Sequence, residues 1–158
     1  GAELQIDETT LRRLHLVCNL GSLTSQYTSE DSSNAHILGA RMPRSPHVSL
    51  NGYVNYDIPI PVGNLKIGAD FQYYSRQFFF PTLSTQTGSE ALQQRAYALL
   101  NAHVTWFPLD SHKLSFDVSV LNIANQGYKL LAIAPGAGVA ATTYGQPRSF
   151  FFQGRYSF

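Results

Sequence analysis

The chain contains five histidines, the side chains best suited to bind a metal ion or transfer a proton near neutral pH. They are scattered along the chain, and none of them stands at a metal-ligand spacing with another. A single cysteine, Cys18, adds no second sulfur ligand. The sequence therefore predicts no metal site. The five residues are His15, His36, His47, His103 and His112.

A second candidate for chemistry is the pair Gly136 and Gly138, which resembles part of a glycine-rich phosphate-binding loop. Such loops follow a parallel strand and begin a helix, and neither context is visible here. We interpret this segment as an external loop. The sequence predicts no catalytic residue and no cofactor-binding residue, and so a protein that is not an enzyme.

Composition narrows the choice of fold and partner. Charged residues make up 13% of the 158 residues, about half the roughly 25% of soluble domains, and aromatic residues another 13%. The mean hydropathy is only −0.13, so apolar and polar residues must be interleaved. A net charge of +1 gives no reason to expect nucleic acid as a partner. No apolar run is long enough for a membrane helix. No signal peptide is visible at Gly1, which favours a partial chain.

Alternation of apolar and polar residues recurs along the whole chain and predicts an all-β fold of about seven antiparallel strands. The alternation indicates neither a helix nor a domain boundary. The expected strands are residues 1–7, 13–27, 47–58, 64–80, 94–107, 113–122 and 148–158.

The last of these strands shows the alternation most clearly. Successive side chains of a strand point to opposite faces, so Phe150, Phe152, Tyr156 and Phe158 share one face. Mostly polar residues, such as Gln153 and Arg155, share the other. An apolar face opposite a polar face, in a strand that ends on an aromatic residue, is typical of a lipid-facing β-barrel.

Connections between the expected strands alternate in length. Long connections follow the second, fourth and sixth strands, with polar loops at residues 28–34 and 81–93 and a long loop at 123–146. Tight turns near Thr10 and at residues 61–64 and 108–112 join the others. Long extracellular loops and short periplasmic turns are the outer-membrane pattern. Aromatic residues near strand ends, at 78–80, 106–107, 156 and 158, predict two interfacial girdles.

Several segments together resemble parts of TonB-dependent outer-membrane receptors. Residues 97–102 (YALLNA) resemble the antepenultimate-strand motif of that family, and residues 120–128 (VLNIANQGY) resemble its N-L-x-N-x-x-Y segment. In the latter, Ile123 and Ala124 stand where Leu and Thr are usual. Residues 144–148 (YGQPR), followed by the strand to Phe158, resemble the closing strand. Residues 1–3 and 42–46 (MPRSP) fit the beginnings of earlier strands.

The resemblance implies an antiparallel transmembrane segment from a barrel of about 22 strands whose lumen holds a plug domain. We therefore expect residues 1–158 to be the C-terminal portion of such a barrel, with the plug domain absent. The implied function is TonB-dependent uptake of a scarce nutrient such as a ferric siderophore. The implied location is the bacterial outer membrane. Partners would be outer-membrane lipid, the barrel assembly machinery, a ferric chelate or similar small ligand, and TonB acting through the plug.

Individual functional residues are harder to assign. In this family the last strand is implied to be the signal read by the assembly machinery, so Tyr156 and Phe158 are candidates for that role. Binding residues concentrate on loops, which makes Tyr144 and its neighbours candidates for ligand contact. Charged residues on the polar face could line a substrate path, although pairing across strands in a wet interior is the simpler interpretation. They are Lys66, Asp70, Arg76, Asp117 and Arg155.

Two other interpretations remain open. A missed strand within residues 123–146 would allow a self-contained barrel of about eight strands, acting as an adhesin, an anchor or a lipid-modifying enzyme. A soluble ligand-binding barrel would instead turn the apolar face inward. The membrane interpretation requires that Leu65, Ile67, Val118 and Phe152 do not lie in a sealed protein interior.

Overall fold

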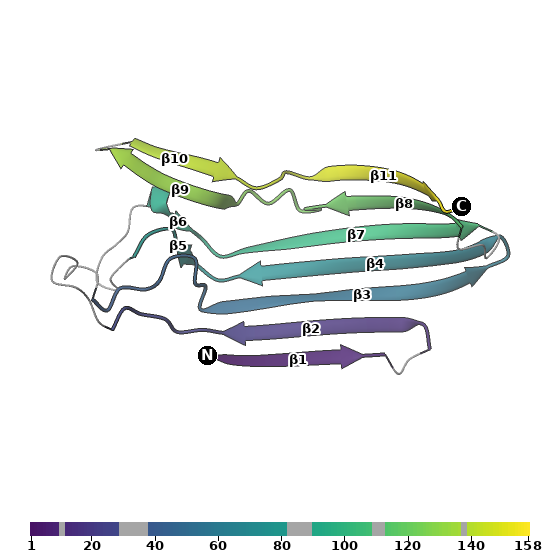
Figure 1. Cartoon of the computed structure of the whole chain (residues 1–158), viewed down its shortest axis with the longest axis horizontal. Helices are drawn as coiled ribbons and strands as arrows, with labels where there is room; N and C mark the ends of the chain where they lie inside the picture. Colours follow the sequence, from purple (N-terminus) through teal and green to yellow (C-terminus); the bar gives the residue numbers. More distant parts are fainter. Residues whose placement is uncertain (10–11, 29–37, 82–89, 109–112, 137–138) are drawn as a thin grey trace.

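A computed structural model describes residues 1–9, 12–28, 38–81, 90–108, 113–136 and 139–158. Seven strands form one sheet, and two short two-stranded ladders lie beyond one end of it (Figure 1). The sheet contains β1 (Ala2–Glu8), β2 (Leu14–Ser22), β3 (Val48–Ile60), β4 (Gly63–Tyr74), β7 (Tyr97–Pro108), β8 (Leu114–Leu121) and β11 (Ser149–Tyr156). The ladders contain β5 (Gln77–Phe78), β6 (Gln93–Gln94), β9 (Lys129–Gly136) and β10 (Val139–Tyr144), beside the 3₁₀ helix η2 (Glu90–Leu92).

The sheet is an antiparallel meander in the order β1-β2-β3-β4-β7-β8-β11. This arrangement confirms the expected all-β fold of about seven strands. The connections after β2, β4 and β8 gather at one end, which we call the loop end, and the short turns and the C-terminus lie at the other, the turn end (Figure 1). The predicted alternation of long and short connections is therefore present.

The turn between β3 and β4 is the tightest in the described part of the chain. Ile60 pairs with Gly63, which leaves only Pro61 and Val62 in the turn. Gly63 has a φ of 127°, a conformation that a side chain would strain. The other two predicted turns, near Thr10 and at 108–112, include residues outside the described ranges. So do the predicted loops at 28–34 and 81–93.

Three strand boundaries differ from expectation. The strand expected at 13–27 ends at Ser22. The strands expected at 64–80 and 94–107 are each interrupted, because β4 and β7 pair only up to Tyr74 and Tyr97. Beyond that point the backbone N–H of Ser75 donates to Val48 instead. Pairing resumes as the separate ladder of β5 and β6, so the two segments stay neighbours after the break.

The loop expected at residues 123–146 was predicted wrongly, because it contains the antiparallel hairpin of β9 and β10. This hairpin forms its own sheet and does not join the main one. It therefore does not supply the missing strand that a closed barrel of about eight strands would need. The main sheet keeps an odd number of strands.

Strand register sorts the side chains onto two chemically different faces. The pairings of Ile67 with Val104, Val104 with Val118, and Val118 with Phe152 continue one apolar row from strand to strand. The same register places polar residues together on the other face, which we call the polar face. The apolar face includes Leu4, Ile6, Leu16, Leu20, Leu50, Val54, Ile58, Leu65, Ile67, Phe71, Leu100, Val104, Trp106, Phe116, Val118, Val120, Phe150, Phe152 and Tyr156.

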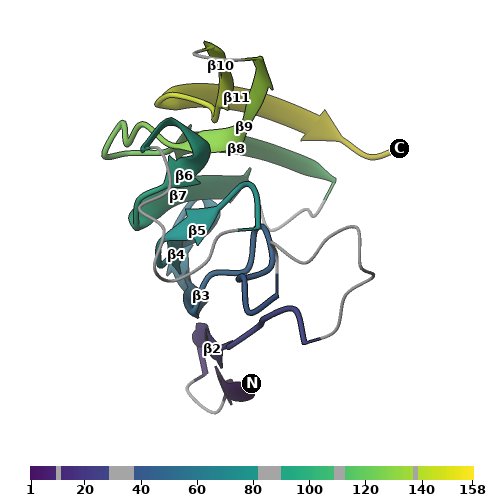
Figure 2. The same cartoon turned by 90° about the vertical axis from the view of Figure 1, so that its left-hand side faces the viewer.

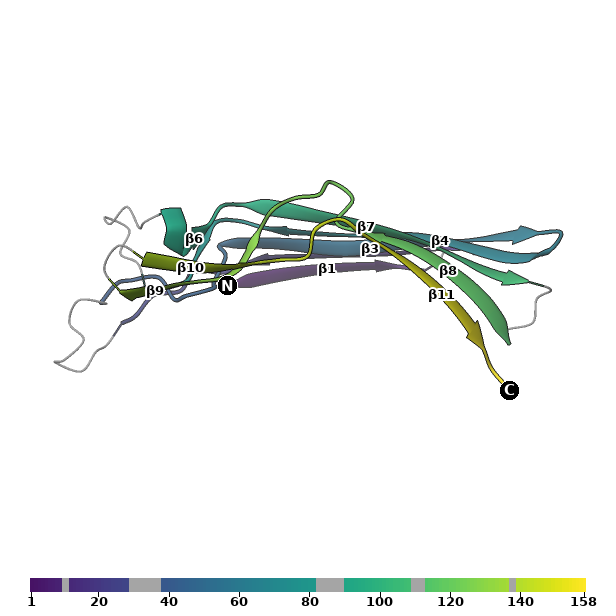
Figure 3. The same ribbon diagram turned by 90° about the horizontal axis from the view of Figure 1, so that it is seen from above.

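No second layer covers the apolar face in the described part of the chain, and Figures 2 and 3 show a single curved sheet. Val118 is 40% exposed and Phe152 is 84% exposed. In the described structure these apolar residues are therefore not sealed in a protein interior, as the membrane interpretation requires. Among the described residues, no helix is long and apolar enough to cross a membrane.

Candidate functional site

Hydrogen bonds between neighbouring strands organise the polar face. Asn101 Nδ2 donates to Asp70 Oδ2 at 2.7 Å, and Thr105 Oγ1 donates to Asp117 Oδ2 at 2.9 Å. Lys66 Nζ lies 3.8 Å from Asp57 Oδ1. Three of the charged residues considered for a substrate path, Lys66, Asp70 and Asp117, thus pair across strands. Their geometry favours the simpler interpretation of a hydrated, internally paired wall.

The other two charged candidates lie elsewhere. Arg155 lines a shallow hollow of about 210 Å³ together with Asp117 and Gln153, near the turn end. Arg76 is exposed in the break between β4 and β5, outside the main sheet. The structure therefore does not bring the five residues into one cluster.

A glycine makes room for two polar side chains at the centre of the polar face. A Cβ atom added at Gly68 would lie 2.3 Å from both Asn55 Oδ1 and His103 Cε1. The side chains of β3 and β7 therefore lean over β4 at this point. Asn55 Oδ1 is buried without a hydrogen-bond partner in the described structure. Such an oxygen is suited to accept a hydrogen bond from water or from a group packed on this face.

The three histidines in the described ranges, His15, His47 and His103, lie apart from one another. His15 Nε2 lies 3.2 Å from Asp7 Oδ1 and 3.4 Å from the Tyr53 hydroxyl, and His47 Nδ1 lies 2.9 Å from the carbonyl oxygen of Leu23. His103 lies beside Gly68, while His36 and His112 lie outside the described residues. Within the described ranges, no group of three or more His, Cys, Asp or Glu side chains could hold a metal ion. Of the glycine pair, Gly136 ends β9 and Gly138 is not described.

At the loop end, a compact turn joins β8 to the hairpin, and Asn122 holds it together. The side chain is buried, and its Nδ2 donates to the carbonyl oxygens of Gln126 and Gln146 at 3.0 and 2.9 Å. Its Oδ1 accepts from the backbone N–H of Gln126 at 2.8 Å. Asn122 and Asn125 both have positive φ, 51° and 50°, which asparagine tolerates better than most residues. Segment 120–128 is therefore a structural turn that leads from β8 to β9, and Asn122 ties it to Gln146, shortly before β11.

Three tyrosines pack together beside this turn. Tyr97 stacks on Tyr128 with ring centroids 5.0 Å apart, and it contacts Tyr74 at 5.6 Å. Gly145 lies against the ring of Tyr128, where a Cβ atom would come within 1.9 Å of the ring carbons. A larger residue at position 145 would push Tyr128 off Tyr97.

Lys129, at the start of β9, is a functional candidate that the sequence analysis missed. Its ammonium donates to the carbonyl oxygens of Glu90, Ala91 and Gln93 at 2.8, 3.0 and 3.2 Å. Nearby, Arg95 pairs with Glu90, and this hydrogen bond and charge lower the pKa of Glu90. No sequence pattern marks Lys129, because its partners are backbone carbonyls distant in the chain.

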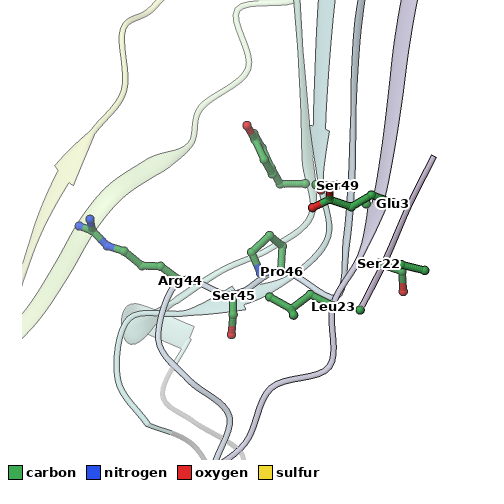
Figure 4. A pocket seen from close by; sticks show the side chains of 11 residues that line it. Glu3, Ser22, Leu23, Arg44, Ser45, Pro46 and Ser49 are labelled. Atoms are coloured by element: carbon green, nitrogen blue, oxygen red, sulfur yellow. The ribbon is translucent and has the colours of Figure 1, made fainter. Parts of the chain in front are cut away.

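The described residues form two notable hollows at the loop end. The larger, about 650 Å³, is formed where the ends of β1, β2 and β3 meet the connection that carries Arg44 (Figure 4). Arg44 extends away from the other labelled side chains of this hollow. The smaller, about 340 Å³, is lined by residues that include Lys129, Tyr128 and Tyr144. Tyr144 thus lies at the loop end, and its contact with a ligand stays a prediction.

At the turn end, Tyr156 and Phe158 are both exposed and meet edge to face with ring centroids 5.2 Å apart. Trp106 and Phe116 stack nearby on the same face, with centroids 5.8 Å apart. These rings agree with the expected girdle at this end. At the other end the expectation is partly wrong, because Phe79 is only 8% exposed and packs inside the loop-end structure.

No family model matches the chain, and no curated protein matches it. Solved structures do match, and over nearly the whole chain. The ferric yersiniabactin uptake receptor FyuA from Yersinia pestis superposes with a TM-score of 0.82 and 18% identity, over 99% of this chain and 23% of that one.

Two further solved structures agree. BauA, the ferric preacinetobactin receptor from Acinetobacter baumannii, gives a TM-score of 0.76 at 16% identity, covering 99% of this chain and 21% of that one. The ferripyoverdine receptor of the outer membrane of Pseudomonas aeruginosa, solved with ferripyoverdine, gives a TM-score of 0.67 at 18% identity. The match covers 99% of this chain and 19% of that one. The chain has the fold of part of a siderophore-receptor barrel.

The matches confirm the fold that the sequence resemblance implied, a segment of an antiparallel receptor barrel. The chain spans about a fifth of the length of the receptors it matches. Its seven strands form an open segment of wall and do not close into a barrel.

Proposed function

We propose that residues 1–158 form the C-terminal portion of the barrel wall of a TonB-dependent outer-membrane receptor. The receptor would import a scarce nutrient such as a ferric siderophore, and its plug domain would lie outside this chain. The observation that carries this proposal is the continuous apolar face of a single-layered sheet whose fold matches three receptors for ferric siderophores.

The dimensions of the strands support a membrane location. β3, β4 and β7 contain 13, 12 and 12 residues. A tilted strand needs about 9–11 residues to cross the hydrocarbon layer, so these strands can cross it and extend beyond. An exposed apolar surface of this extent would drive aggregation in water. Lipid would cover the apolar face and so prevent this aggregation. The polar face would then line the lumen.

The asymmetry of the connections supports one orientation. We propose that the loop end is extracellular and that the turn end, with Phe158, is periplasmic. Tyr156 and Phe158 would then lie where the barrel assembly machinery could read the last strand before the barrel closes. The free edge of β11 offers unpaired backbone groups for such recognition.

The proposed mechanism is transport without chemical conversion. The loop-end connections would capture a ferric chelate, and the polar wall would hold the plug through hydrogen bonds to groups such as Asn55 Oδ1. TonB, acting on the plug, would open the path. In this mechanism the chain contributes barrel wall, loops and the closing strand, and it catalyses no reaction.

Uptake by the natural protein that contains this chain tests the proposal. Cells that produce it in an iron-poor medium should accumulate radioactive iron from at least one chelate in a siderophore panel. Accumulation should stop when either the receptor gene or TonB is deleted. A protein found in the outer-membrane fraction that transports no chelate would contradict the uptake proposal. Absence from that fraction would contradict the barrel assignment.

A further inference from the structure

The three loop-end connections, named by the strands they join as β2–β3, β4–β7 and β8–β11, are linked to one another in every pair. The strongest link joins β4–β7 to β8–β11 through the ammonium group of Lys129. This group has three N–H donors, and it lies within hydrogen-bonding distance of three carbonyl oxygens of residues 90–93. All three donors are therefore used inside the protein.

A second contact strengthens the same link. The backbone N–H of Lys129 donates to Gln94 Oε1 at 2.6 Å, and Gln94 Nε2 donates to the carbonyl oxygen of Arg95 at 2.7 Å. Gln94 is only 6% exposed. Both the main chain and the side chain of Lys129 thus hold β9 against η2 and β6.

Arg44 supplies the other two links. Its backbone N–H donates to the carbonyl oxygen of Phe78 at 2.8 Å, which joins β2–β3 to β4–β7. Its guanidinium Nη2 donates to the carbonyl oxygen of Leu130 at 3.1 Å, which joins β2–β3 to β8–β11. Arg44 has a φ of 54°, so the backbone is held in an uncommon conformation at this junction.

We infer that Lys129 and Arg44 are positioning residues that lock the described parts of the three loop-end connections into one unit. Because Leu130 follows Lys129 in the chain, the contacts of both cations meet at the first two residues of β9. If one connection moves, either its contacts to the other two connections break or those connections move with it. The geometry of this unit does not depend on the proposed function. Its role, to hold the ligand-capturing connections in one arrangement, rests on that function.

Hydrogen exchange of the natural full-length protein, in detergent or lipid discs, tests the lock. Lys129→Met removes the contacts to residues 90–93, and Arg44→Met removes only the side-chain contact to Leu130. We expect roughly tenfold faster exchange at the directly contacted segment, the factor expected for loss of a charge-assisted hydrogen bond.

The deciding signal comes from the segments that the changed side chain does not touch. Arg44→Met should also speed exchange at residues 90–94, and Lys129→Met should speed exchange at residues 42–46. Lys129→Arg, which keeps the charge, should restore part of the protection. Lys113→Met, at the turn end, is the matched control and should change none of these segments. Effects confined to directly contacted segments would overturn the inference.

Amine acetylation of the unaltered protein gives a second measurement that needs no variant. Because its donors are engaged, Lys129 should react roughly tenfold more slowly than the exposed Lys113. Equal acetylation rates at Lys129 and Lys113 would overturn the inference that the ammonium group of Lys129 is engaged. These measurements are independent of transport, so a locked unit in a protein without siderophore uptake would contradict the proposed function alone.

Discussion

At the scale of single residues, the polar side chains of the loop end mainly satisfy backbone groups of other segments. Asn122 holds a turn together through hydrogen bonds to backbone carbonyls, and Lys129 donates hydrogen bonds to carbonyl oxygens of η2. Tyr156 and Phe158 differ, because they contact each other and otherwise stand exposed on the apolar face. Rings at such positions fit an interfacial girdle and a recognition role together.

Phe158→Ala should lower the amount of the natural receptor that reaches the outer membrane by several-fold, because the last strand loses its terminal ring. Ser157→Ala is the matched control on the opposite face and should have little effect. Immunoblots of outer-membrane fractions, compared with total protein, measure the change. Equal insertion of the Phe158 variant and the unaltered receptor would remove the case for an assembly signal.

At the scale of the element, each strand carries the sidedness of the whole sheet. In β8, Val118 lies between Val104 and Phe152 on the apolar face, and Ser119 lies between His103 and Phe151 on the polar face. Adjacent residues of one strand thus face different surroundings.

Val118→Arg should destabilise the folded receptor by about 2–4 kcal/mol, the cost of a cation facing lipid near the middle of the layer. Ser119→Arg adds the same side chain one residue away but on the polar face, where we expect about 1 kcal/mol or less. Denaturant titration of the receptor folded in phospholipid vesicles measures both. Equal costs for the two variants would contradict the lipid-facing assignment of the apolar face.

At the scale of the whole molecule, the sheet is one curved layer with two free edges. In the described structure, β1 and β11 each have one strand neighbour, so each presents a row of unpaired backbone groups. Unpaired edges of this kind are templates on which further strands can pair.

Produced alone in aqueous buffer, the 158-residue chain should form large associated species, because its edges and its apolar face are both uncovered. Light scattering coupled to size-exclusion chromatography measures this association. Detergent should reduce it by covering the apolar face. A sharply melting water-soluble monomer would contradict the wall assignment and would favour a self-contained soluble protein.

The sequence by itself determined the seven strands of the main sheet and their two faces, apart from some strand ends, because a period of two residues is a local property of the backbone. The alternation at residues 114–121 and 149–156 already separated Val118 and Phe152 from Asp117 and Gln153, and strand pairing only aligned the rows. The alternating lengths of the connections were equally readable, since they follow from the strand positions alone.

Only the tertiary structure decided the arrangement at the loop end. The residues of β9 and β10 lack the alternation that marks the other strands, and they pair as a hairpin that packs beside η2. Lys129 and Arg44 find backbone carbonyls that lie far away in the chain, and a carbonyl has no sequence signature. Such contacts depend on which segments the fold brings together, so they become visible only in three dimensions.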